Sequence, residues 1–205
     1  MRSDEFQCDN SEHKRSLLDS ELVGSLGITA TDGFPRVIPV HFASDGEVIY
    51  IHGAAEGEKF KLFKAKPNVT FSVFRLYASI PNHWLGGKHG CLATAFYRSV
   101  YVKGVGSLVD DPSEKARALQ RLMEKHQPDG GFIPVDHEKP TYAKPMKDVA
   151  IFRIDPVFTS MKCKFAQSLT EGVKKRVIGK LLERGSEADI ETVREMEHPK
   201  SGPCP

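Results

Sequence analysis

Residues 47–73, EVIYIHGAAEGEKFKLFKAKPNVTFSV, constrain the fold more than any other part of the chain. Residues 48–51 are β-branched or aromatic, which is typical of a half-buried strand. A turn rich in glycine and alanine follows His52, and residues 58–66 then predict a short basic helix. Pro67 ends this helix because its ring cannot donate a backbone hydrogen bond, and the apolar run after it predicts a second strand.

The turn between this strand and this helix is suited to an anion. Backbone N–H groups are free at a helix N-terminus, and the helix dipole adds positive charge there. Gly53 and Gly57 keep the turn nearly bare, and Lys59 adds a cation beside it. We therefore predict an anion pocket. The alternative is a surface helix whose lysines are merely solvated, and spacing alone does not separate the two.

Two Asp-Gly turns organise the strands that precede this unit. Asp32-Gly33 separates strands predicted at 25–30 and 36–43, and Asp45-Gly46 leads into the next strand, so the three form an antiparallel meander. Pro39 lacks a backbone donor, which places it at a sheet edge or a bulge. Its neighbours then keep backbone groups free for a ligand. An edge proline without a ligand is the alternative.

The remaining elements follow from apolar periodicity and capping signals. They are a helix within 11–22, strands at 97–109 and 149–154, a helix that begins after Asp111, and C-terminal helices announced by a capping box at Ser168–Glu171 and by Ser186. Asp155-Pro156 is expected to end the last strand, and Gly185 to cap the first C-terminal helix. Residues 75–95 surround Trp84 with glycines and predict a mobile loop that could cover a planar ligand; a plain surface loop is the alternative.

The composition fits one globular domain, with 205 residues of which 40% are hydrophobic and 27% charged. The formal net charge of +2 argues against a dedicated nucleic-acid surface, so we expect no nucleic-acid partner. No apolar run reaches the roughly 20 residues of a membrane helix, and no apolar segment follows the first five residues. We therefore expect a soluble, cytoplasmic protein without a membrane partner.

The four cysteines, Cys8, Cys91, Cys163 and Cys204, are widely separated. They form no Cys-x-x-Cys pair and no His–Cys cluster at the usual zinc spacing. We expect free thiols rather than disulfides, and no metal site.

Three short motifs occur in an informative order. Pro39-Val40-His41-Phe42 is followed by the His52-Gly53 turn and then by Tyr97-Arg98-Ser99-Val100. With the flanking GFPRVIPVHF and PNVTFSVF, this order resembles the flavin-binding split-barrel superfamily of pyridoxamine 5′-phosphate oxidase, and within it the nitroimidazole-resistance (Nim-type) branch. The resemblance extends from Leu17 to Thr159. Each motif alone is weak, and the ordered set carries the resemblance.

The resemblance implies a mainly β fold, a six-stranded antiparallel split β-barrel of the FMN-binding type with flanking helices and a C-terminal helical extension. The barrel domain would span residues 11–160, and residues 161–205 would form the helical extension and tail, packed on the same domain. The resemblance also implies FMN as the cofactor and a homodimer with pockets at the interface.

The resemblance further implies where FMN is held. Its ring would lie along the proline-containing strand, largely against the backbone of Ile38, Pro39 and Val40, and its phosphate at the turn of Gly53, Gly57 and Lys59. Other branches carry Ser-Arg-Lys or Ser-Arg at the end of this turn, whereas this chain has Gly57-Glu58-Lys59. One phosphate-binding arginine is therefore missing, and Lys59 carries more of the phosphate charge.

Three further side chains are candidates by the same resemblance. His52 matches the histidine of the His-Gly motif, so we expect it to contact the cofactor and to act catalytically by positioning substrate or supplying a proton. Arg98 and Ser99 are candidate contacts to the phosphate or the flavin. An interface ion pair is the alternative for Arg98.

The function implied is flavin-dependent reduction of a small organic substrate, such as a nitro-aromatic compound. Oxidation of pyridoxamine phosphate is not expected, because the C-terminal region lacks the Arg-x-His pattern of that branch. One alternative is a flavin-binding sensor or transcriptional regulator without turnover, since the segment Lys-Phe-Ala-Gln-Ser resembles PaiB-like regulators. Another is a split barrel that holds haem or the deazaflavin F420, with His41 or His52 as the axial ligand for haem.

Overall fold

The computed structural model describes residues 6–8, 10–87 and 92–197 of the chain, so Cys91 and Cys204 lie outside the described part. The strands are β1 (Val23–Thr29), β2 (Pro35–Asp45), β3 (Val48–Ala54), β4 (Asn68–Ile80), β5 (Thr94–Leu108) and β6 (Val149–Lys164). The helices are α1 (Ser11–Ser20), α2 (Gly57–Lys64), α3 (Pro112–His126), α4 (Pro145–Asp148), α5 (Glu171–Arg184) and α6 (Glu187–Glu197), with short 3-10 turns at Asn82–Leu85 and Pro140–Tyr142. Within the described residues, no helix combines the length and the apolar character needed to cross a membrane.

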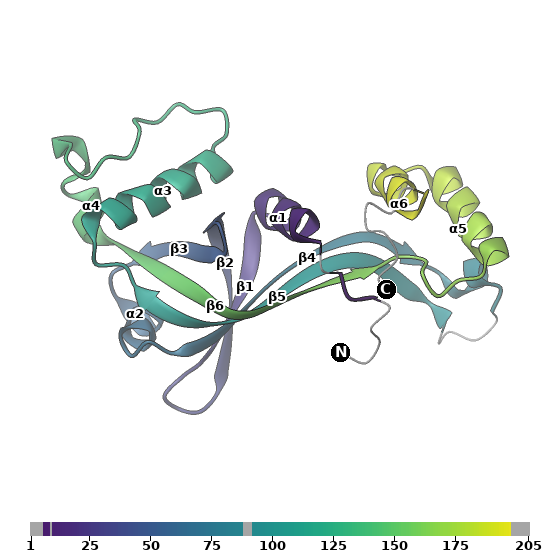
Figure 1. The fold of residues 1–205 in the computed structure, drawn as a ribbon, viewed down its shortest axis with the longest axis horizontal. Helices are drawn as coiled ribbons and strands as arrows, with labels where there is room; N and C mark the ends of the chain where they lie inside the picture. Colours follow the sequence, from purple (N-terminus) through teal and green to yellow (C-terminus); the bar gives the residue numbers. More distant parts are fainter. Residues whose placement is uncertain (1–5, 9, 88–91, 198–205) are drawn as a thin grey trace. The chain divides into compact units, whose positions relative to one another are not determined.

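The six strands form a closed barrel in the order β1-β2-β3-β6-β5-β4 (Figure 1). β1 pairs antiparallel with β2 on one side and with β4 on the other, which closes the barrel. β2 turns into β3 at the second Asp-Gly turn, where Asp45 lies opposite Val48. The predicted meander and the predicted mainly β fold with six antiparallel strands and flanking helices are confirmed.

The chain divides into two compact units, and β4, β5 and β6 each contribute residues to both. The second unit contains residues 18–73 and 101–159. The first unit contains the described residues within 1–17, 74–100 and 160–205. The boundary expected from the sequence, between a barrel at 11–160 and an extension at 161–205, stays a prediction.

The second unit is built around a core of aromatic and branched side chains from strands and from α2. Its fully buried members include Leu26, Phe42, Ile51, Phe63, Phe71, Phe152 and Ile154. The ring of Phe63 on α2 meets that of Phe152 edge to face, with centroids 4.9 Å apart, which anchors this short helix on the barrel. α3 covers β2 and β3 (Figure 1), and Asp111 caps its start by accepting a 2.7 Å hydrogen bond from the N–H of Glu114, as predicted.

In the first unit, α5 and α6 pack together through Val177, Leu181, Val193 and Met196, all buried. α5 ends at Gly185, which has φ 69° and is the C-cap that the sequence predicts. α6 starts with a capping box in which the N–H groups of Ser186 and Asp189 each donate to the other residue's side chain at 3.2 Å. The predicted helix start at Ser186 is confirmed.

Other sequence predictions for the first unit are wrong. The N-cap residue of α5 is Thr170, and its side chain makes no capping hydrogen bond, so the capping box predicted at Ser168–Glu171 does not form. β4 runs on to Ile80, with Tyr77, Ala78 and Ile80 buried, where a loop was expected from residue 75. The mobile loop around Trp84 is also wrong in its described part, since Trp84 is buried with the Arg184 guanidinium 4.9 Å above its ring.

The last strand is longer than predicted. β6 passes through Asp155-Pro156 and ends at Lys164. The stretch around Pro156 is partly exposed, and proline removes one donor without preventing an extended backbone. Beyond it, Met161 and Cys163 restore the alternation of buried positions.

Candidate functional site

β2 and β3 separate after a short paired segment in the second unit. Their pairing runs from Asp45 opposite Val48 to Phe42 opposite Ile51. Beyond this point residues 35–41 pair with β1 and residues 52–54 pair with β6. Among the described residues, the facing edges of the two strands thus have no strand partner, and the free backbone edge predicted around Pro39 is confirmed.

The side chains of β2 alternate across this free edge. Val37, Pro39 and His41 are exposed, whereas Ile38 is half-buried and Val40 is buried. The exposed face of this edge thus carries the side chains of Val37, Pro39 and His41, and the opposite face packs toward the core.

Three histidines lie where the strands separate. The rings of His41 and His126 stack, with centroids 4.5 Å apart and planes 16° apart. Nε2 of His126 lies 3.1 Å from the carbonyl oxygen of Phe42 and donates to it, since a carbonyl only accepts. This bond ties the end of α3 to the last residue of β2 that pairs with β3.

The surroundings lower the pKa of two of these imidazoles, those of His52 and His126. Partial desolvation lowers the pKa of His52, although the residue keeps an exposed surface, and the nearby positive charges of His41 and Lys59 lower it further. Burial likewise lowers the pKa of His126 and outweighs the hydrogen bond to Phe42, which acts in the opposite direction. A neutral imidazole can both donate and accept, so it can orient a substrate or hold a proton.

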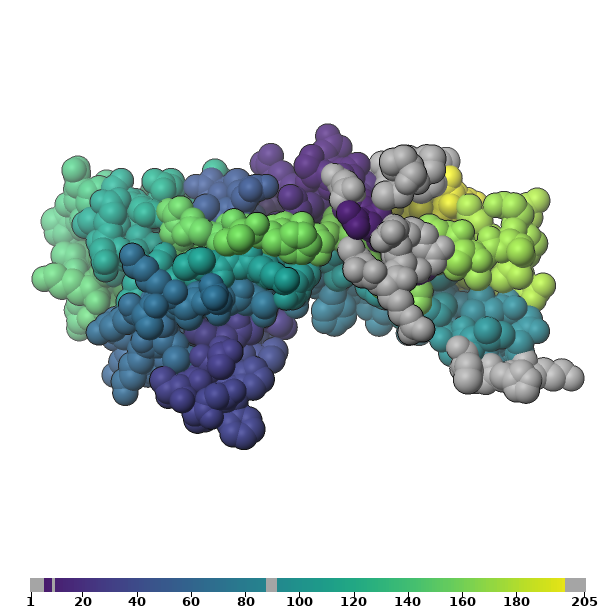
Figure 2. Space-filling model, turned by 60° about the horizontal axis from the view of Figure 1, so that its bottom comes forward, coloured from purple at the N-terminus to yellow at the C-terminus, as the bar shows by residue number. Residues whose placement is uncertain are grey.

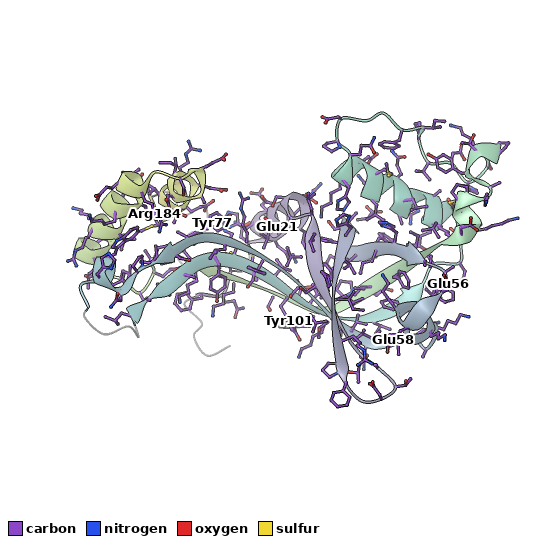
Figure 3. The ribbon with its side chains drawn as sticks, turned by 180° about the vertical axis from the view of Figure 1, so that it is seen from behind. Glu21, Glu56, Glu58, Tyr77, Tyr101 and Arg184 are labelled. Atoms are coloured by element: carbon purple, nitrogen blue, oxygen red, sulfur yellow. The ribbon has the colours of Figure 1, made fainter. Side chains whose placement is uncertain are left out.

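The start of α2 forms the second part of the site. Gly57 has φ 84°, a backbone conformation that favours glycine, and Glu56 before it makes no side-chain cap. The first N–H groups of α2 are therefore free of a capping side chain. Figure 3 marks this helix start by the labels of Glu56 and Glu58.

Lys59 lies half-buried beside β3. Its Nζ is 4.5 Å from the ring centroid of Phe152 and would be 3.1 Å from a Cβ atom placed on Gly53. Desolvation lowers the pKa of Lys59, and among the described residues no carboxylate forms an ion pair with it. Glycine at position 53 leaves space for this ammonium group, which is an uncompensated cation.

Arg36 reaches the same helix from β2. Its Nε and Nη2 donate to the two carboxylate oxygens of Glu58 at 3.2 and 3.0 Å, and Nη2 also donates to Asp32 at 2.7 Å. In the space-filling view, the purple residues of the β1–β2 hairpin lie against the blue of α2 (Figure 2). Arg36 thus brings a guanidinium to the first turn of α2, where the helix's own side chain, Glu58, is acidic.

An apolar groove of about 460 Å³ lies in the same unit, lined by β1, β2, β4, β5 and β6. Val37 and Val157 border it and keep 72% and 77% of their surface exposed. Two such exposed valines on one groove mark a surface that another apolar surface can cover.

The predicted site residues fall into two groups. The second unit brings together Ile38, Pro39, Val40, His52, Gly53, Gly57 and Lys59. Arg98 and Ser99 belong to the first unit. There Arg98 is buried, with Nη2 2.5 Å from Glu195 and Nη1 3.3 Å from the Tyr77 hydroxyl. The predicted cofactor contacts of Arg98 and Ser99 stay predictions.

Sequence analysis missed two members of the site. Arg36 lies 22 residues from Glu58, and His126 lies 84 residues from Phe42. The acid at position 58, in a turn otherwise suited to an anion, is the signal that could have prompted a search for a compensating arginine.

A model of the family described as pyridoxamine 5′-phosphate oxidase matches residues 10–163. The match takes in most of the chain, so the chain belongs to the pyridoxamine 5′-phosphate oxidase family, and the resemblance noted in the sequence is confirmed. A search of curated protein sequences gives no significant match.

Solved structures share the fold at low sequence identity. One is a candidate 5-nitroimidazole antibiotic resistance protein from Bacteroides thetaiotaomicron, at 18% identity and TM-score 0.61, covering 76% of this chain and 85% of that one. The flavocytochrome Anf3 from Azotobacter vinelandii has 22% identity and TM-score 0.63, with 78% and 69% covered. A FAD and heme binding protein from Mycobacterium smegmatis has 18% identity and TM-score 0.65, with 78% and 74% covered.

Proposed function

We propose that this protein is a homodimeric, FMN-binding oxidoreductase that reduces a small organic substrate, such as a nitro-aromatic compound. Three features of the described residues carry the proposal: the free edge of β2, a start of α2 without a side-chain cap, and Lys59 without an ion-pair partner. The flavin ring would lie along Ile38, Pro39 and Val40. The phosphate would lie at the start of α2, beside Gly57 and Lys59.

The residues present fit this cofactor. Gly53 leaves the space that Lys59 occupies, and unpartnered backbone groups of β2 can bond the polar edge of a flavin. Arg36 offsets the acidic Glu58, which otherwise would repel a phosphate. The arginine missing from the turn is therefore supplied from the neighbouring strand.

When bound, FMN would supply the electrons for reduction of the substrate. The chain's own part is to bind, to orient and to move a proton. His52 lies at the end of the free edge, and its lowered pKa keeps the ring neutral near neutral pH. A neutral ring can hold the substrate by a hydrogen bond or pass on a proton, the catalytic role we propose for it.

A second copy of the chain would complete the site. The groove bordered by Val37 and Val157 offers the exposed apolar surface that a homodimer interface would bury. Ser99 is a proposed contact from that second copy. For Arg98, burial and the ion pair with Glu195 of the same chain support a structural role within the first unit.

Titration of the purified protein with FMN, followed by absorbance and flavin fluorescence, tests the proposal. A charge-assisted contact contributes about 1.5–3 kcal/mol, so Lys59→Ala should weaken binding about 10-fold or more. Lys64→Ala is the matched control, because Lys64 lies at the far end of α2 over Phe60 and should leave binding unchanged. A wild-type protein that does not bind FMN would refute the proposed function.

Haem is a second candidate ligand, favoured by the exposed imidazoles of His41 and His52 where the strands separate. The His52 ring could act as an axial ligand as it stands, and the His41 ring could do so once it leaves its stack on His126. Adding haem in the same titration distinguishes the two ligands. A shifted Soret band that is lost in the double variant His41→Ala/His52→Ala would support haem. An unchanged free-haem spectrum with the wild type would exclude it.

A further inference from the structure

The first unit contains a buried cluster of two cysteines and a histidine that the proposed flavin site does not use. Cys8, His13 and Cys163 are each at most 6% exposed. Their potential ligand atoms all lie within 4.8 Å of one another, and Sγ of Cys8 is 3.9 Å from Nδ1 of His13. Zinc bonds of about 2.3 Å to sulfur and about 2.0 Å to nitrogen, at a tetrahedral angle, put S and N about 3.6 Å apart. The cluster is thus close to the size of a zinc site before any adjustment.

Three separate pieces of local structure hold the ligands in place. Cys163 lies on β6. Cys8 lies on the N-terminal segment, which is held beside β6 because the N–H of Cys8 donates to the carbonyl of Met161 at 3.1 Å. His13 lies in the first turn of α1. Asn10 caps that turn, because its side-chain oxygen accepts from the N–H groups of Glu12 and His13 at 2.9 and 3.0 Å.

An unsatisfied donor lies beside the cluster. Nε of Arg98 is buried, and within the described residues it is the buried side-chain atom that has no hydrogen-bond partner. The Arg98 guanidinium lies close enough to the Cys163 thiol for its positive charge to act on it. A metal-bound thiolate is an acceptor for such a donor.

Zinc binds cysteine as the thiolate, so a divalent cation at this cluster would take up both sulfurs in that form.

We propose that Cys8, His13 and Cys163 bind one Zn²⁺ ion, with a water molecule as the fourth ligand. Among the common divalent metals, zinc is the one typically bound by a set of thiolates and imidazoles such as this one. The ion would join the N-terminal segment, α1 and β6. Sequence inspection did not find the site, because Cys8-x4-His13 lacks the usual zinc spacing and Cys163 is distant in the chain.

Metal analysis of the full-length protein, purified under reducing conditions and exchanged against zinc-free buffer, tests the proposal. We expect about one zinc per chain in the wild type and less than about a tenth of that in Cys8→Ser and Cys163→Ser, because thiolates supply most of the bond strength. His83→Gln is the control, since His83 is an exposed histidine of the same unit and should leave the zinc content unchanged.

Replacement of zinc by Co²⁺ in the wild type gives a readout that does not depend on the folding of variants. Intense ligand-field bands with sulfur-to-cobalt charge transfer would support the two-thiolate site. A wild type without zinc and without these bands would overturn the proposal. A disulfide between Cys8 and Cys163, found by peptide mass spectrometry of protein purified without reductant and not prevented by added zinc, would also overturn it and assign the pair to redox chemistry.

Discussion

Gly53→Ala tests the proposed phosphate end of the flavin site. Its methyl group would lie 3.1 Å from Nζ of Lys59 and 3.1 Å from Cε2 of Phe152. Phe152 is fully buried in the barrel core, whereas the end of a lysine side chain is flexible, so Lys59 is the group that moves. The substitution therefore displaces the cation, and its contact with Phe152 requires an adjustment of a few tenths of an ångström in the core.

The expected magnitude follows from the contact that is lost. An ammonium–phosphate contact contributes about 1.5–3 kcal/mol, so complete loss would weaken FMN binding about 10- to 150-fold. Partial displacement should give about a 10-fold loss. The free energy of unfolding should fall by about 1 kcal/mol, the usual cost of one crowded methyl group.

FMN titration and thermal unfolding of Gly53→Ala, Lys59→Ala and the double variant provide the measurement. If Gly53→Ala acts through Lys59, the double variant should bind FMN no more weakly than Lys59→Ala alone. Gly172→Ala serves as the control, because a Cβ atom there meets nothing within 4 Å. Wild-type affinity in Gly53→Ala, or the same fold-loss in the Lys59→Ala background, would refute the reasoning.

Three further predictions concern charged groups. Arg36→Ala should weaken FMN binding about fivefold, because Glu58 is left without its exposed partner near the phosphate. Salt screens the exposed carboxylate, so the loss should be smaller at high ionic strength, and equal losses at low and high ionic strength would contradict this. Arg98→Met should lower the free energy of unfolding by about 3 kcal/mol, because it leaves Glu195, whose side chain is only 14% exposed, without its partner. Arg75→Met removes a more exposed pair with Glu191 and should cost less than about 1 kcal/mol. Chemical denaturation would show whether the two variants differ. Arg184 and Ser186 lower the pKa of the buried Asp189 to about 2. The ionised carboxylate therefore stabilises the folded state by about 2 kcal/mol above pH 4, and this contribution is lost as the pH falls from about 4 to 2. In Asp189→Asn this part of the acid dependence of unfolding should vanish.

The sequence predicted the elements that local chemistry determines. The Asp-Gly turns placed the first three strands, and Pro39 indicated the free edge that β2 presents beyond Phe42. Asp111 and Gly185 marked helix ends correctly, because each cap depends on residues a few positions away. The lengths of β4 and β6 were underestimated, since extended backbone there is maintained by neighbouring strands and not by the residues' own preferences.

Prediction of the site had the same limit. The His52–Lys59 turn is one continuous segment, so its members were identified together. Arg36 and His126 join it only through strand pairing and helix packing, which sequence spacing does not show. The Cys8 and His13 cluster was missed because Cys163 reaches it through the extension of β6 that was not predicted.

The ion pair between Arg36 and Glu58 gives the proposed phosphate site a competitor built into the protein. An anion that binds at the start of α2 would compete with Glu58 for Arg36, which this carboxylate already holds by two hydrogen bonds. A dianionic phosphate can do so, whereas a singly charged or neutral ligand gains too little from the exchange. The site would then discriminate by charge as well as by shape, accepting FMN and leaving riboflavin, which has the same ring without the phosphate, largely unbound.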